Sequence, residues 1–127
     1  ESRKEKSIET TQDLVSVIEK AVPSWYKHKK IHFATKTFQA LRITVNDEIG
    51  ALKEVLPKAI EALEENGRLA VISFHSIEDR IVKQYFREQK ESEIGTIITK
   101  KPIVPSRDEV KTNPRSRSAK LRIFEKK

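Results

Sequence analysis

The chain has 127 residues, which suits one domain and is too short for two of ordinary size. It contains no cysteine, which excludes a disulfide framework and suits a reducing, cytoplasmic environment. No apolar run approaches the roughly 18 residues that a membrane-spanning helix needs, and no signal-peptide pattern opens the chain. We therefore expect a cytoplasmic protein.

The positive charge is concentrated in the C-terminal part of the chain. Residues 1–97 hold 16 basic and 16 acidic residues, whereas residues 98–127 hold ten basic and three acidic ones. The formal net charge of +7 therefore arises from the last 30 residues. A one-sided basic segment favours binding to a polyanion, most often a nucleic acid, and a solvated basic tail is the alternative.

Two helices are predicted in the first part of the chain, after a charged segment over residues 1–7 that is expected to fray. The first helix is predicted to begin in Thr10-Thr11-Gln12-Asp13, with a threonine cap and an acid in its first turn, and to end before Pro23, because the apolar residues between recur at helical spacing. The second spans about Ala34–Asp47. Its predicted core stripe is Phe38, Leu41 and Val45. The polar residues predicted to leave that stripe are Lys36, Gln39 and Arg42.

A third helix and a buried strand are predicted next. The helix should run from about Ile49 to Glu65, with Pro57 kinking or restarting it and Asn66-Gly67 ending it. The short apolar run Leu69–Phe74 is typical of an interior strand in a parallel sheet that is covered on both faces. A further helix then begins with Ser76 as its expected cap and with acidic residues in its first turn.

The last third of the chain is predicted to contain two strands and a loop. Thr96–Thr99 is a candidate strand, Lys100–Asn113 is a long loop with two prolines, and Ala119–Phe124 is a final strand. This order resembles the second half of a doubly wound α/β domain, and not a complete one. Because the chain also opens E-S-R-K-E-K without a Met, we expect it to be part of a longer protein.

Polar residues directly follow the apolar strand, in the stretch F-H-S-I-E-D-R. Ligands of open α/β sheets gather at the carboxyl ends of strands, so His75 and Ser76 are expected to face a crevice. The alternative is that Ser76 only caps the helix and that His75 packs at its base. Because His75 and Ser76 are adjacent, they are poorly placed as base and nucleophile, and the pattern does not indicate a hydrolase.

The stretch N-P-R-S-R-S-A-K-L-R, residues 113–122, is the strongest indication of nucleic-acid contacts. Arg115 and Arg117 lie on a predicted turn, and Lys120 and Arg122 lie on the strand that follows. Planar guanidinium groups and hydroxyls suit contacts to phosphate. A charged surface hairpin without a ligand is the alternative interpretation.

Motifs for metals and nucleotide cofactors are absent from the sequence. The three glycines are isolated, so the chain contains no glycine-rich phosphate loop. His28 and His32 are four residues apart, but no Cys, Asp or Glu completes a metal site at conventional spacing. We therefore predict a solvated basic turn at these histidines and no metal ion.

Three blocks of the sequence resemble the RsmH (MraW) family. They are H-F-A-T-K-T-F-Q-A-L-R-I (32–43), G-R-L-A-V-I-S-F-H-S-I-E-D-R-I-V-K (67–83) and N-P-R-S-R-S-A-K-L-R (113–122). The segment K-P-I-V-P-S, residues 101–106, also matches in position. The resemblance covers the chain in order from about Glu9, and Phe33, where many members have proline, is a mild departure.

The resemblance implies a bacterial methyltransferase that uses S-adenosylmethionine to methylate the N4 amine of a decoding-centre cytosine in 16S ribosomal RNA. It also implies that residues 1–45 end an inserted helical subdomain and that residues 46–127 form the C-terminal half of a Rossmann-like domain with an antiparallel final strand. The family's glycine-rich cofactor loop lies upstream of this chain. We therefore expect the chain alone not to bind S-adenosylmethionine, and no cofactor-binding residue is assigned to it.

The resemblance also assigns candidate site residues and a partner. The catalytic-pocket candidates are His75, Ser76, Glu78 and Asp79. The RNA-contact candidates are Arg115, Arg117 and Lys120, with Lys36, Gln39 and Arg42 as a second set. The implied partner is 16S rRNA in the small ribosomal subunit or its precursor, and a homodimer is one assembly that the sequence leaves open. A non-catalytic nucleic-acid-binding module and a DNA cytosine-N4 methyltransferase are the competing functions.

Overall fold

The computed structural model describes Lys4 and residues 7–127, so most of the segment that was expected to fray lies outside the described residues. The chain divides into two compact units, Glu1–Glu48 and Ile49–Lys127. The assignment of the first unit to an inserted subdomain stays a prediction. Among the described residues, no helix combines the length and the apolarity that crossing a membrane requires.

In the part that the structure describes, the named helices of the first unit are α2 (Thr11–Ala21), α3 (Ser24–Lys27) and α4 (Thr35–Val45). The predicted threonine cap of α2 is confirmed, and the structure identifies it as Thr10, whose Oγ1 accepts a hydrogen bond from the Asp13 backbone N–H at 3.1 Å. The Asp13 carboxylate accepts in return from the Thr10 N–H at 3.0 Å, which completes a capping box. Local side-chain chemistry therefore determines where this helix begins.

The predicted core stripe of α4 is wrong in part. Leu41 and Val45 are exposed, and the Val45 side chain retains 80% of its accessible surface. Instead, Phe38 lines a cavity of about 440 Å³ together with Gln39 and Arg42, which were expected to leave its face. Residues at positions i, i+1 and i+4 share a broad helix face, so this face of α4 is amphipathic rather than uniformly apolar.

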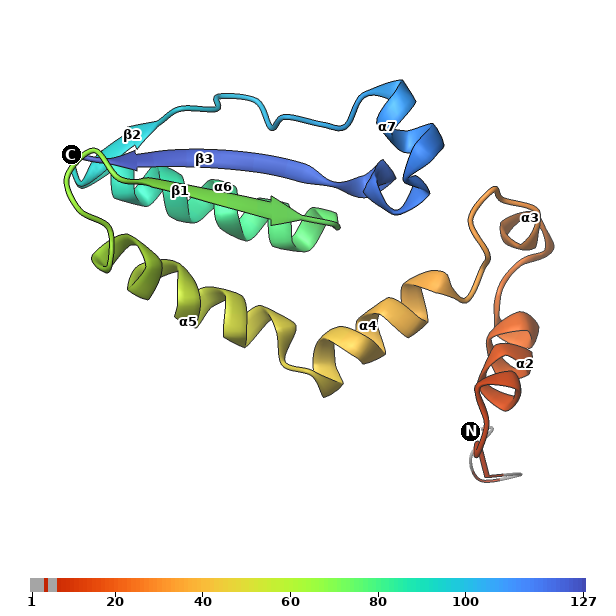
Figure 1. Ribbon diagram of the computed structural model, residues 1–127. Helices are drawn as coiled ribbons and strands as arrows, with labels where there is room; N and C mark the ends of the chain where they lie inside the picture. The colour runs from red at the N-terminus through yellow and green to blue at the C-terminus, as the bar shows by residue number, and fades with distance from the viewer. Residues whose placement is uncertain (1–3, 5–6) are drawn as a thin grey trace. The chain divides into compact units, whose positions relative to one another are not determined.

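The second unit combines four helical segments with a three-stranded sheet. Its helical segments are α5 (Glu48–Glu61, whose first residue belongs to the first unit), α6 (Ser76–Glu91), α7 (Arg107–Thr112) and the 3-10 helix η1 (Pro114–Ser118). Its strands are β1 (Arg68–Ser73), β2 (Gly95–Ile97) and β3 (Lys120–Lys126). The order is β1-β3-β2, and β3 runs antiparallel to both neighbours (Figure 1). The expected α/β class and the antiparallel final strand are confirmed.

The core of the second unit lies between one face of the sheet and two helices. Phe124 of β3 is fully buried, and its ring centroid lies 5.2 Å from that of Phe86 on α6. Val82 of α6 and Leu56 and Ile60 of α5 complete the buried cluster. Burial of these apolar side chains is the main force that holds α5 and α6 against the sheet.

The prediction that β1 is covered on both faces does not describe this structure. Leu69 and Val71 pack against the core, whereas Ala70 and Ile72 lie on the opposite face and Ile72 is 59% exposed. The only strand paired with β1 in the described residues is β3. Side chains alternate across a strand, and the described helices that pack on this sheet contribute their buried residues to one face.

The end of α5 also differs from the prediction. The helix continues through Pro57 without restarting and ends at Glu61, four residues early. Pro57 is exposed, so the carbonyl that loses its intrahelical partner there can bond to water. The left-handed residue of the following turn is Asn66, with φ of 64°, and not Gly67.

The segment predicted as a long loop contains a short helix. Ser106 caps α7, because its Oγ accepts from the Glu109 N–H at 3.1 Å, and two acidic residues occupy the first turn. Ahead of it, Ile103 bridges to Leu121 of β3 through two backbone hydrogen bonds of 2.9 Å. The serine cap and the favourable helix dipole outweigh the prolines that suggested a loop.

Candidate functional site

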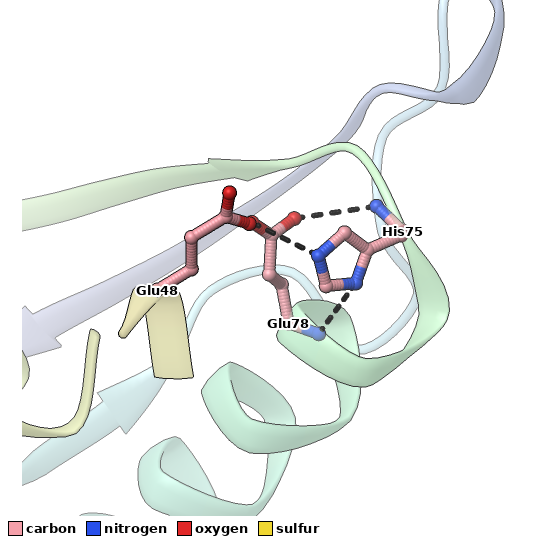
Figure 2. A group of neighbouring side chains, drawn as sticks. All are labelled: Glu48, His75 and Glu78. Carbon is pink, nitrogen blue, oxygen red and sulfur yellow. Dashed lines mark hydrogen bonds and ion pairs between the residues drawn. The ribbon is translucent and has the colours of Figure 1, made fainter. Parts of the chain in front are cut away.

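The carboxyl end of β1 leads into α6 through a capping box that is formed by His75 and Glu78. His75 Nδ1 accepts a hydrogen bond from the Glu78 N–H at 3.3 Å (Figure 2). The Glu78 carboxylate accepts in return from the backbone N–H groups of Phe74 at 2.9 Å and His75 at 3.3 Å. The predicted cap, Ser76, is wrong: the extended backbone of His75 places its own ring over the first turn, and Ser76 is the first helical residue.

The capping box also determines the state of the His75 ring. Because Nδ1 accepts a hydrogen bond, the proton of the neutral imidazole is assigned to Nε2. Nε2 is buried, lies 3.3 Å from Glu78 Oε1, and has no hydrogen-bond partner among the described residues. His75 is therefore held in one orientation and one tautomer, with a single ring donor left over at the strand end.

Asp79 joins α6 to β3 through a buried ion pair. Its Oδ1 accepts from Arg122 Nε at 2.8 Å, and its Oδ2 accepts from Arg122 Nη2 at 3.3 Å and from Lys120 Nζ at 3.2 Å. The exposed fractions are 9% for Asp79 and 7% for Arg122. Burial acts to raise the pKa of Asp79, but hydrogen bonds from Arg122 and Lys120, together with their charges, outweigh burial and hold the pKa below its usual value.

The four catalytic candidates therefore fall into separate arrangements. His75 and Glu78 contact each other, whereas Asp79 is engaged with β3. Ser76 is exposed, and its hydroxyl makes no hydrogen bond within the described part of the chain. Arg122 could not be recognised from the sequence as the partner of Asp79, because no local spacing connects residues that lie 43 positions apart.

The residues of the first set of RNA-contact candidates lie in two different environments: two are exposed, and one is engaged in an ion pair. Arg115 and Arg117 are exposed on η1, which is neither the predicted turn nor a hairpin, and in the described chain neither forms an ion pair. Ser116 between them is buried, and its hydroxyl donates to the Asn113 carbonyl at 2.8 Å, which fastens the segment. Lys120 differs, because its ammonium group is engaged with Asp79.

The second set lies on α4 in the first unit. Lys36 is exposed, and Gln39 and Arg42 line the cavity beside Phe38. Arg42 is already paired: its Nε and Nη2 donate to the Glu48 carboxylate at 2.7 and 3.0 Å. Arg42 is therefore held by an acidic residue of its own unit, unlike Arg115 and Arg117.

The described residues do not fit S-adenosylmethionine by themselves. A nucleotide cofactor needs a turn where backbone approaches it closely, usually one rich in glycine. Gly50 lies inside α5, Gly67 lies at a turn where a Cβ would meet the Glu64 carbonyl oxygen and Leu63, and Gly95 lies in β2 against β3. None of these glycines follows the carboxyl end of β1, so we assign no step of cofactor binding to this chain.

Comparison with known proteins adds independent information. The model of the MraW methylase family matches residues 1–127. The chain is 54% identical over 123 residues to "Ribosomal RNA small subunit methyltransferase H" of Sulfurihydrogenibium sp. (strain YO3AOP1), covering 97% of this chain and 42% of that protein. It is 56% identical over 126 residues to the protein of the same name from Borreliella burgdorferi (strain ZS7), covering 99% of this chain and 42% of the relative.

A third relative shows the same partial coverage. The protein of the same name from Persephonella marina (strain DSM 14350 / EX-H1) is 52% identical over 123 residues, again with 97% of this chain and 42% of the relative covered. The chain thus spans about two fifths of the length of the curated relatives it matches. Because the family model covers the chain from its first residue to its last, the chain belongs to the MraW methylase family.

Proposed function

We propose that the intact protein transfers a methyl group from S-adenosylmethionine to the N4 amine of cytosine 1402 in 16S rRNA. The observation that carries this proposal is the family match over residues 1–127, supported by relatives that are named as small-subunit rRNA methyltransferases. Since the chain spans 42% of those relatives, the proposal concerns the whole protein. Its site of action is the cytoplasm, where small ribosomal subunits and their precursors occur.

In this proposal, the carboxyl end of β1 contributes one wall of the pocket that receives the cytosine. Glu78 positions the His75 ring, whose buried Nε2–H is left without a hydrogen-bond partner among the described residues. The Glu78 carboxylate is the charged group best suited to stabilise positive charge on the methylated amine. Ser76 is an exposed hydroxyl at the same strand end, and Asp79 supports the wall through its pairing with Arg122.

The cofactor site is proposed to lie outside this chain. Within the described residues β1 pairs only with β3, which supports this arrangement, because an edge strand suits pairing with further strands of a larger sheet. A target base within RNA must be unstacked to reach such a pocket, and contacts to the RNA backbone would hold it there. The exposed guanidinium groups of Arg115 and Arg117 are the residues proposed for those contacts.

A methyl-transfer assay tests the proposed reaction. The intact protein, incubated with labelled S-adenosylmethionine and small subunits that lack the modification, is expected to place the label in N4-methylcytidine, detected by mass spectrometry of digested nucleosides. Duplex DNA serves as the control substrate and should remain unlabelled. Labelled DNA with unlabelled RNA would favour the DNA methyltransferase, and RNA binding without any transfer would favour the non-catalytic module.

A second prediction concerns the basic 3-10 helix. Replacing Arg115 and Arg117 with alanine together is expected to weaken RNA binding by the intact protein and to flatten its salt dependence. Each lost phosphate contact should reduce the slope of log K against log salt by about 0.7 for single-stranded RNA, so the pair should reduce it by roughly 1.4. Anisotropy titrations at several salt concentrations measure this slope.

The matched control for this pair is a double variant on α7, Arg107→Ala with Lys111→Ala. It removes the same charge from exposed positions in a neighbouring helix, and Lys111 is already paired with Asp108 at 3.0 Å. Its salt slope should stay close to that of the unmodified protein. Equal slopes for the Arg115/Arg117 variant and the unmodified protein would remove the RNA role from η1.

A further inference from the structure

A cationic groove lies between α6 and the strands β2 and β3, and of the basic residues that the sequence indicated for nucleic-acid contacts it includes Arg122. Its cavity has a volume of about 270 Å³. Five of its eight lining residues are basic: Lys83, Arg87, Lys90, Lys100 and Arg122. The other lining residues are Phe86, Ile97 and Thr99, so no acidic side chain of the described residues lines this groove, although Arg122 is paired with Asp79 beside it. A surface this uniform in charge attracts anions.

Three of these cations form a stripe along α6. Lys83, Arg87 and Lys90 are spaced at i, i+4 and i+7, which places them on one helix face over about 10 Å. All three are exposed, and none of them forms an ion pair within the described residues. Like charges at this spacing repel one another, and a bound polyanion would relieve that repulsion.

The floor of the groove is mainly apolar. Phe86 is buried in the core, and Ile97 packs against the same cluster. Arg122 is held in place by Asp79 through its Nε and Nη2 atoms. Charges next to an apolar surface are less screened than charges surrounded by water, so this floor strengthens the attraction of the cations for an anion.

A polar group at the edge of the floor adds a directional contact. Thr99 is buried, and its Oγ1 accepts a hydrogen bond from the Ile123 N–H at 2.9 Å. Its hydroxyl hydrogen has no other partner among the residues that the structure describes. A hydroxyl donor beside guanidinium and ammonium groups is a combination suited to phosphate oxygens.

We propose that this groove binds backbone phosphates of the RNA substrate, an inference that rests on the proposed function. A stripe of about 10 Å that ends in further cations is longer than a single phosphate, and it matches a strand that carries one charge on every nucleotide. The groove contacts the backbone and therefore contributes affinity and orientation rather than recognition of a base. In this arrangement the target cytosine is bound at the carboxyl end of β1, and not in the groove.

The test compares two triple variants of the intact protein. Lys83→Gln with Arg87→Gln and Lys90→Gln removes the stripe, while Lys53→Gln with Lys58→Gln and Lys111→Gln removes three exposed charges that do not line the groove. The probe is single-stranded oligouridylate RNA, titrated by anisotropy at several salt concentrations without S-adenosylmethionine. The stripe variant should lose about 2 from the salt slope, at roughly 0.7 per phosphate, and the control should lose less than half of that.

The outcomes separate the sources of phosphate and the two proposals. Equal slopes for the two triple variants, with unchanged melting temperatures, would overturn the RNA role of the groove. In a second arm, inorganic phosphate is titrated against both variants; loss of phosphate binding with an unchanged RNA slope also overturns it and indicates a small-anion site. Because binding is measured without methyl transfer, a stripe-dependent slope in a protein that methylates no RNA would contradict the proposed reaction alone.

Discussion

Replacing Asp79 with alanine is expected to lower the free energy of unfolding of the intact protein by about 3–5 kcal/mol. The substitution leaves the buried Arg122 guanidinium without its carboxylate, and Lys120 then adds a second uncompensated positive charge nearby. Leaving a buried charge unpaired costs far more than the pair itself contributes. Urea denaturation followed by circular dichroism measures the loss.

Lys120→Ala is the control for this prediction. Its side chain is 38% exposed, so its ion pair with Asp79 is screened by solvent and its removal should cost about 1 kcal/mol or less. A smaller loss for Asp79→Ala than for Lys120→Ala would show that the pair with Arg122 does not hold α6 to β3. The loss of unfolding free energy for Asp79→Asn should lie between those for Asp79→Ala and Lys120→Ala, because asparagine keeps the shape of the side chain but lacks its charge.

The Asp79 contribution also has a defined pH dependence. The pKa of Asp79 is lower in the folded protein than in the unfolded chain, because Arg122 and Lys120 outweigh the effect of burial. The stabilisation is therefore complete above the unfolded value of about 4 and is lost as the pH falls through the lowered folded value. The difference in stability between unmodified protein and Asp79→Asn should shrink over that acidic range.

Replacing Phe124 with alanine is expected to cost about 3–5 kcal/mol of unfolding free energy. Phe124 is fully buried in the middle strand of the sheet, where it meets Phe86 of α6 and the apolar side chains of α5. The truncation removes these contacts and leaves a cavity that the rigid sheet cannot fill. Denaturation curves of the intact protein give the change.

The conservative variant Phe124→Leu tests the physical cause. It keeps most of the apolar volume and should cost about 1 kcal/mol. Unlike the Asp79 variants, both Phe124 variants should show a loss that does not change between neutral and acidic pH, because no titrating group is removed. A loss below about 1 kcal/mol for Phe124→Ala would contradict the placement of this side chain at the centre of the core.

Local chemistry explains which elements could be predicted. The start of α2 and the strand character of residues 69–73 follow from capping residues and apolar runs that any chain displays within a few positions. The errors arise where two local signals compete. At residues 107–112, a serine cap outweighs nearby prolines, and at the start of α6 an imidazole replaces the expected hydroxyl as the cap.

Only the part of the candidate site that is built from residues close together in the sequence could be predicted. His75 and Glu78 are three positions apart, so a helix start alone brings them together. Arg122 and Asp79 lie 43 positions apart, and they meet only because β3 inserts between β1 and β2 above α6. The groove cations also combine local and long-range contacts. The helical spacing of Lys83, Arg87 and Lys90 can be read from the sequence, but only the fold brings them close to Lys100.

The sequence by itself determined the α/β class, the positions of most helices and strands, the C-terminal excess of positive charge and the family resemblance, because each depends on neighbours along the chain or on composition. Only the tertiary structure decided which charges are free and which are paired. Arg115 and Arg117 remain exposed while Lys120 and Arg122 are engaged with Asp79, although all four belong to one basic stretch. Ion pairing and burial depend on contacts between distant segments, and those contacts exist only after the sheet has formed.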